Sequence, residues 1–190
     1  MTGSFIVVYD ACVLYPMILR DLLLRLASTD FFMAKWTNAI HEEWNRSVLK
    51  NRSDLTRDKL EKIRILMDQS TIDSLIYDYE HLINELNLPD PNDRHVLAAA
   101  IHAKASIIVT LNLKDFPPAN LSQYKIEACH PDDFIMLLTE IDLNIVLSSA
   151  KTARTSLKNP SLRFYEYLGI LEKHGLYNTA KLFRMNELLV

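Results

Sequence analysis

Acidic side chains that could do chemistry together occur at intervals through the first 115 residues. Asp10 directly follows an apolar run, and Glu43 lies near the start of an expected helix. Asp90 and Asp93 flank the opening of another expected helix, and Asp115 comes shortly after a third apolar run. We expect no histidine, cysteine or lysine to join them, and oxygen ligands alone suit Mg²⁺ or Mn²⁺. The expected chemistry is metal-assisted phosphodiester hydrolysis, in which a cation activates water and stabilises the leaving oxygen.

Asp10 and Glu43 each have a simpler structural interpretation as well. Asp10 equally suits a turn or helix cap, and Glu43 equally suits the rim of a helix N-terminus. With about 100° per residue, Glu43 flanks the apolar helix face that contains Ile40, whereas Glu42 points nearly opposite. Glu43 is therefore the inward-facing candidate of the two glutamates.

Asp90 and Asp93 resemble a capping box, in which an acid at the cap and another three residues later favour the positive helix end. Asp93 is nevertheless in line with the apolar stripe that contains Val96 and Leu97. A buried carboxylate is costly unless it is paired or bound to a cation. We therefore favour a functional role for Asp93 and a structural one for Asp90, with metal binding by Asp90 left open.

Alternating strands and helices are expected to position these acids. Apolar runs rich in β-branched and aromatic residues predict strands over 5–9, 31–36, 106–110 and 125–129. Helices are expected over 16–27, 38–50, 55–67, 81–86, 90–104 and 131–140. This alternation implies an α/β fold with right-handed crossovers and a mostly parallel sheet of about four to five strands, flanked by helices. Ligands bind at the carboxyl ends of such strands, so Asp10, Asn112 and Asp115 should emerge at one sheet edge.

The chain beyond residue 140 has a wholly helical pattern. Helices are expected over 143–157, 160–174 and 176–188, with Gly175 ending the second of them. We therefore expect a domain over residues 1–140 and a helical C-terminal extension over 141–190. These helices should pack on the sheet domain or on another subunit.

Composition excludes several other classes of protein. The chain has 190 residues and three glycines, none of which lies in a strand-to-helix turn of the first 150 residues, so nucleotide cofactors held by glycine-rich loops are excluded. Two distant cysteines exclude a disulfide framework and do not have zinc-site spacing. The N-terminal residues lack the pattern of a signal peptide, and no apolar run is long enough for a bilayer. We expect a soluble, cytoplasmic protein without membrane contact.

Four segments together resemble a PIN-domain nuclease, and the bacterial VapC-type toxin branch in particular. They are Asp10 after the first strand, the Thr37…Glu43 element, the segment from Asp90 to Ala100, and the segment from Thr110 to Pro117. The similarity spans about residues 4–135. It implies a PIN-like fold and a Mg²⁺- or Mn²⁺-dependent endoribonuclease with Asp10, Glu43 and Asp93 as its acidic triad.

The resemblance also assigns supporting roles. Many PIN domains have a fourth aspartate where this chain has Asn112. Asp115 is the candidate that would replace that aspartate. Whether the site binds one cation or two is left open. Thr110 is expected to support the site by hydrogen bonding, and Thr37 and Asn112 are further supporting candidates. Asp90 would assist directly or through water.

RNA is the substrate that the resemblance implies, and a small antitoxin protein and a homodimer are the partners expected for toxin members. The main alternative is a catalytically weak or inactive PIN-like module that binds RNA or protein, which the Asn112 departure and the helical extension favour. A phosphatase with Asp10 as nucleophile is disfavoured, because Cys12 stands where that mechanism would place a second carboxylate.

Overall fold

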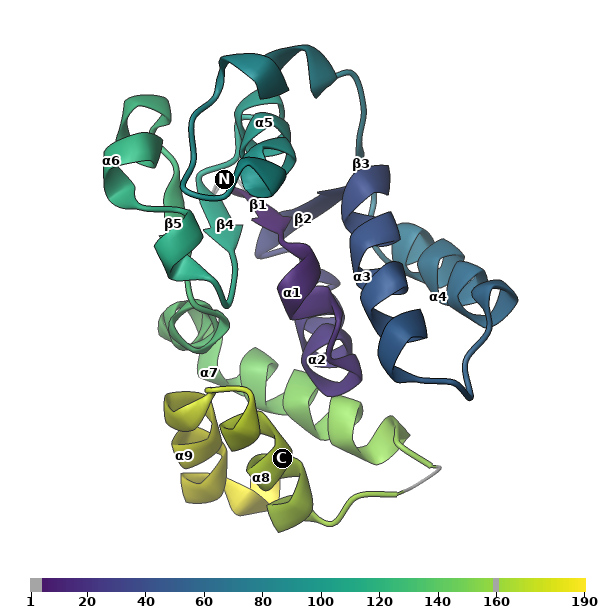
Figure 1. The fold of residues 1–190 in the computed structure, drawn as a ribbon. Helices are drawn as coiled ribbons and strands as arrows, with labels where there is room; N and C mark the ends of the chain where they lie inside the picture. Colours follow the sequence, from purple (N-terminus) through teal and green to yellow (C-terminus); the bar gives the residue numbers. More distant parts are fainter. Residues whose placement is uncertain (1–4, 159–160) are drawn as a thin grey trace.

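A parallel β-sheet organises the first two thirds of the chain in the computed structural model, which describes residues 5–158 and 161–190 (Figure 1). Within those residues the sheet has five strands in the order β3-β2-β1-β4-β5, and every pairing is parallel. The strands are β1 (Phe5–Tyr9), β2 (Phe32–Thr37), β3 (Leu75–Ile76), β4 (Ile107–Val109) and β5 (Glu127–Cys129). The predicted α/β class and mostly parallel sheet are confirmed.

Helices follow most of the strands, largely where the sequence predicts them. They are α1 (Ala11–Leu14), α2 (Met17–Ala27), α3 (Asn38–Asn51), α4 (Arg57–Ser70), α5 (Arg94–His102), α6 (Pro118–Leu121), α7 (Pro131–Ser156), α8 (Phe164–Lys173) and α9 (Tyr177–Met185). Short 3₁₀ turns occur at η1 (Glu80–Glu85), η2 (Pro91–Asp93), η3 (Leu113–Asp115), η4 (Ser122–Tyr124) and η5 (Glu187–Leu189).

Two helix predictions need correction, and the predicted break between two later helices is present. The expected helix over 81–86 is the 3₁₀ turn η1, and the one over 90–104 divides into η2 and α5. The separate helices expected over 131–140 and 143–157 are confirmed: α7 is interrupted at Asp142, whose φ of −157° and ψ of 104° are non-helical, and the Asp142 carboxylate accepts from the Ile145 backbone N–H (3.1 Å) at the start of the second part. The expected start of the next helix at residue 160 lies outside the described residues.

The direction of the crossovers places helices on both faces of the sheet. The chain moves from β1 to β2 in one direction and returns from β3 to β4 in the other. Because both crossovers are right-handed by rule, α2 and α5 cover opposite faces. Tyr9 joins the layers on the α2 side: its ring lies 6.5 Å from that of Phe134 in α7, and its hydroxyl donates to the Leu23 carbonyl across 3.1 Å.

The C-terminal helices pack beneath the sheet domain, with α7 against α2 and with α8 and α9 against each other and against α7 or α2 (Figure 1). The buried Asp132 fixes α9 to the start of α7, because its carboxylate accepts hydrogen bonds from the backbone N–H groups of Asn178 (2.9 Å) and Thr179 (2.8 Å). The interruption of α7 at Asp142 lies beside the boundary proposed between residues 140 and 141, and the division into two domains there remains a prediction.

Candidate active site

Asp10 lies at the carboxyl end of β1, at the point where the strand order reverses between β1 and β4. Ligands of open α/β sheets bind at this switch point. The Asp10 backbone N–H donates to the Val109 carbonyl (3.1 Å), and its side chain is only 4% exposed. Oδ2 accepts hydrogen bonds from the Thr110 hydroxyl (2.7 Å) and the Cys12 thiol (2.9 Å). Asp10 is thus held by groups from both sides of the switch point.

The same bonds explain the protonation behaviour of Asp10. Burial raises the pKa of the Asp10 carboxyl, and the hydrogen bonds from Cys12 and Thr110 lower it in part. Both donors point at Oδ2, and no bond from a described side chain is assigned to Oδ1. A carboxylate with one oxygen occupied and the other available can serve as a cation ligand.

Asp93 shows that the predicted acids converge. Burial, the largest cause, and the negative charges of Asp10, Asp90, Asp115 and Glu43, in that order, together raise the pKa of Asp93 to about 7. These residues come from the ends of β1 and β4, from α3 and from the η2–α5 corner. Without a cation, Asp93 is therefore partly protonated near neutral pH.

Glu43 contacts a histidine that the sequence did not place in the site. Glu43 Oε2 lies 3.3 Å from His95 Nε2, and His95 is on α5, two residues after Asp93. The expectation that no histidine joins the acids is therefore wrong for His95. No sequence signal identifies it, because a residue two positions from Asp93 faces a different side of an ideal helix.

Cys12 is a second contributor that the sequence did not identify. Besides donating to Asp10, its sulfur lies 3.3 Å from Thr110 Oγ1 and accepts a bond from the Leu111 backbone N–H (3.1 Å). Burial raises the pKa of the Cys12 thiol well above its usual range, so this group stays a neutral donor. The sequence signal that could have identified Cys12 is its position two residues after Asp10.

The three predicted supporting residues lie where they can hold the acidic side chains in place. They are Thr110, Asn112 and Thr37. The Thr110 hydroxyl accepts from the Asn112 backbone N–H (3.0 Å) while it donates to Asp10. Thr37 is fully buried, and its hydroxyl accepts from the Ile40 backbone N–H (3.1 Å), which fixes the start of α3. Because Glu43 is the sixth residue of α3, this cap sets where the Glu43 backbone lies.

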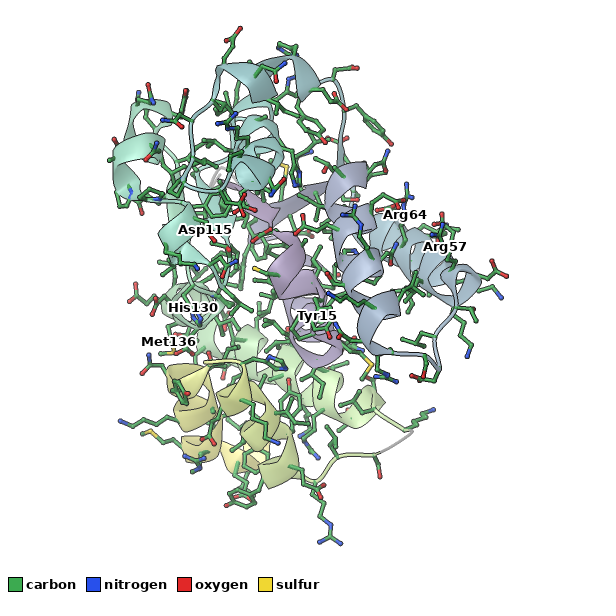
Figure 2. The ribbon with its side chains drawn as sticks, viewed as in Figure 1. Tyr15, Arg57, Arg64, Asp115, His130 and Met136 are labelled. Carbon is green, nitrogen blue, oxygen red and sulfur yellow. The ribbon has the colours of Figure 1, made fainter. Side chains whose placement is uncertain are left out.

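The remaining predicted acids lie at the edge of the cluster. Asp90 Oδ1 accepts from the backbone N–H (2.9 Å) and the side-chain amide (3.0 Å) of Asn92, so it caps η2. Asp115 is half-buried in η3, toward the β4–β5 side of the molecule (Figure 2). Asn112 is exposed, and its backbone carbonyl accepts from the Asp115 N–H (3.0 Å).

The donor chemistry of the site fits a hard divalent cation, because its oxygens belong to carboxylates that repel one another. In the present positions, no group of three or more His, Cys, Asp and Glu side chains among residues 5–158 and 161–190 could hold a metal ion. The raised pKa of Asp93 indicates that a positive charge between the carboxylates would be favourable.

Comparisons with known proteins match both parts of the chain. A family model described as "PIN domain" matches residues 6–114, and one described as "VapC50 C-terminal domain" matches residues 131–184. A curated relative from Mycobacterium tuberculosis, named "Putative ribonuclease VapC50", is 51% identical over 67 residues, which are 35% of this chain and 38% of the relative. The match thus spans well under half of that relative's length. No solved structure matches.

Proposed function

The chain belongs to the PIN-domain family, and from this premise we propose that it is a metal-dependent endoribonuclease that hydrolyses RNA phosphodiester bonds. The convergence of negative charge on Asp93 carries the proposal, because acids from separate elements meet at the switch point of the sheet. Perturbed pKa values and grouped carboxylates of this kind are concentrated at functional sites. The similarity to a protein named as a ribonuclease supports RNA as the substrate.

Asp10, Glu43 and Asp93 are the proposed ligands of Mg²⁺ or Mn²⁺, with Asp115 or Asp90 assisting directly or through water. When bound, such an ion supplies Lewis-acid activation of the phosphate and of the attacking water. Thr110 and Cys12 hold Asp10 Oδ2, which leaves Oδ1 for the ligand position. His95 holds Glu43 beside the cluster, and Thr37 fixes the helix that carries Glu43.

The similarity to VapC-type proteins extends the proposal to the biological role. We propose a toxin of a toxin–antitoxin pair that acts in the cytoplasm, with a small antitoxin protein as its partner and a homodimer as its assembly. In the part of the chain that the structure describes, no helix has the length and apolarity required to cross a bilayer.

One observation favours a second candidate function. Asn112 presents an exposed amide where many PIN domains have a carboxylate. The second candidate is therefore a PIN-like module that binds RNA or protein with little or no catalysis.

Incubation of total RNA with the purified protein separates these two functions. We expect new fragments with defined ends in Mn²⁺ or Mg²⁺, and none in EDTA. Asp78→Asn is a matched control, because Asp78 is exposed and far in the sheet order from Asp10, at the end of β3. Intact RNA in every divalent ion would contradict the nuclease and favour the binding module.

A further inference from the structure

A cavity of about 470 Å³ adjoins the acids and is lined by both the sheet domain and the C-terminal helices. It shares Glu43 and Cys12 with the acidic cluster, and His174, at the end of α8, lines it from the C-terminal side. Its size is within the roughly 300–1,000 Å³ of small-ligand sites. Any group bound here would therefore lie next to the proposed reaction centre.

The chemistry of the lining suits a neutral, planar group with polar edges. Tyr15 and His174 supply rings, and Ser47, Asn51 and Asn112 supply hydroxyl and amide groups. None of the described residues that line it is a lysine or arginine, and Glu43 lies at its edge, so the cavity is poorly suited to a phosphate. Unstacked RNA bases bind on aromatic side chains and form hydrogen bonds through their edges, which is what this lining offers.

The turn that follows His174 packs closely against the sheet domain. The next residue, Gly175, has a φ of +82°, and a Cβ at that position would lie 3.3 Å from the ring of His130. Gly175 therefore lets the turn after α8 approach the junction of β5 and α7 closely. The bonds from Asp132 to the start of α9 fix the other side of the same turn.

The His174 ring is in the uncharged state that suits a neutral ligand. Burial lowers the pKa of its imidazole, so the ring is uncharged at neutral pH. The His174 side chain lines the cavity, so its ring nitrogens can bond a ligand there. Tyr15 is half-buried at the end of α1, between α2 and α3 in the view of Figure 2.

We propose that this cavity binds one unpaired base of the RNA next to the scissile phosphate, with Tyr15 and His174 as its aromatic contacts. The C-terminal helices then take part in substrate selection, since they supply His174. This inference rests on the proposed ribonuclease function for the identity of its ligand. The binding measurement below nevertheless tests the cavity without requiring catalysis.

Cleavage mapping on an RNA pool with a randomised single-stranded segment gives the first test. The parent should prefer one base beside the cleaved bond, and His174→Ala and Tyr15→Leu should lower kcat/KM at preferred sites about tenfold, the size expected for loss of one stacked base. His174→Phe, which keeps an aromatic face, should lose less. His81→Ala is the matched control, since His81 is exposed on η1 and does not line the cavity. Unchanged rate and base preference in both His174→Ala and Tyr15→Leu would overturn the proposal.

Binding of fluorescent homopolymeric hexaribonucleotides to the Asp10→Asn protein gives the second test. One homopolymer should bind more tightly than the others, and adding His174→Ala should remove that preference while melting curves confirm the fold. Base selectivity that depends on His174, together with a parent protein that cuts no RNA in Mg²⁺ or Mn²⁺, would support the cavity and contradict the nuclease. Equal affinities for all homopolymers, or selectivity that survives His174→Ala, would overturn the cavity even if RNA is cut.

Discussion

The Thr110 hydroxyl donates to Asp10 Oδ2 across 2.7 Å and thereby joins two residues that are 100 positions apart in the sequence. Thr110 follows β4 directly and Asp10 follows β1, and these two strands are neighbours at the switch point of the sheet. Open α/β sheets generally bind ligands at this switch point, and the bond fixes the position of one carboxylate there. Four expected results follow from this site and from its link to the C-terminal helices.

Replacement of Thr110 by valine removes the hydroxyl at nearly constant volume. Because the hydrogen bond from Thr110 lowers the pKa of Asp10, that pKa should rise further in Thr110→Val. The free energy of unfolding should fall by about 1–3 kcal/mol, the cost of losing a buried bond to a carboxylate. Mn²⁺ affinity measured by calorimetry should also fall, whereas Thr110→Ser should restore both. Equal Mn²⁺ affinity in parent and Thr110→Val would argue against this role.

Asp93 predicts a pH-dependent stability of the metal-free protein. Its folded-state pKa of about 7 lies above the ordinary value of roughly 3.9, so the folded state favours the proton. The stabilisation is present below about pH 4 and is lost as pH rises toward 7. In EDTA at pH 8, Asp93→Asn should therefore melt at a higher temperature than the parent, and the difference should shrink at pH 4. A less stable Asp93→Asn at pH 8 would contradict the crowding of charge.

With a divalent cation, the parent should melt at a higher temperature than Asp93→Asn. Mg²⁺ or Mn²⁺ binds the folded state and relieves the repulsion between the acids, so the parent's melting temperature should rise with ion concentration. Asp93→Asn should respond much less, because it lacks one proposed ligand. Thermal melts at pH 8 over a series of Mn²⁺ concentrations measure both. Equal responses from the two proteins would exclude Asp93 as a ligand.

Asp132 is expected to hold the C-terminal helices on the sheet domain. Asp132→Ala leaves the amides of Asn178 and Thr179 without their acceptor and should cost about 3 kcal/mol, since both bonds are to a buried charge. Hydrogen exchange should speed up at these two amides. Asp133→Ala is the matched control, because Asp133 is exposed on the same turn of α7. Similar exchange in the two variants would show that α9 is held by other contacts.

Much of this architecture could be predicted from local patterns. The run Phe5–Tyr9 predicts β1 with its observed bounds, and the helical period distinguishes Glu43 from Glu42. The helix expected from residue 38 begins there, and the Thr37 hydroxyl accepts the Ile40 N–H at its start. These features depend on residues close in the sequence, so one chain is enough to show them.

Other features depend on contacts that no local pattern contains. Cys12 reaches Thr110 only because β1 and β4 pair in one register, and His95 reaches Glu43 only because α3 and α5 meet. The two-residue strand β3 is too short to produce a periodic signal. His174 lines the cavity beside Glu43 because of the docking of α8 and α9, and the sequence left open whether these helices pack on the sheet domain or on another subunit.

The single-turnover rate of cleavage of one mapped RNA by the parent and by Asp10→Asn, both in the same Mn²⁺, tests the central claim most directly. The proposed role of Asp10 predicts a loss on the order of 10²–10³-fold or more, the size seen when one preorganised charge-stabilising group is removed. Asp78→Asn should cut at the parent's rate, and all cleavage should stop in EDTA. Equal rates for Asp10→Asn and the parent, or cleavage that persists in EDTA, would contradict a metal-dependent nuclease at this site.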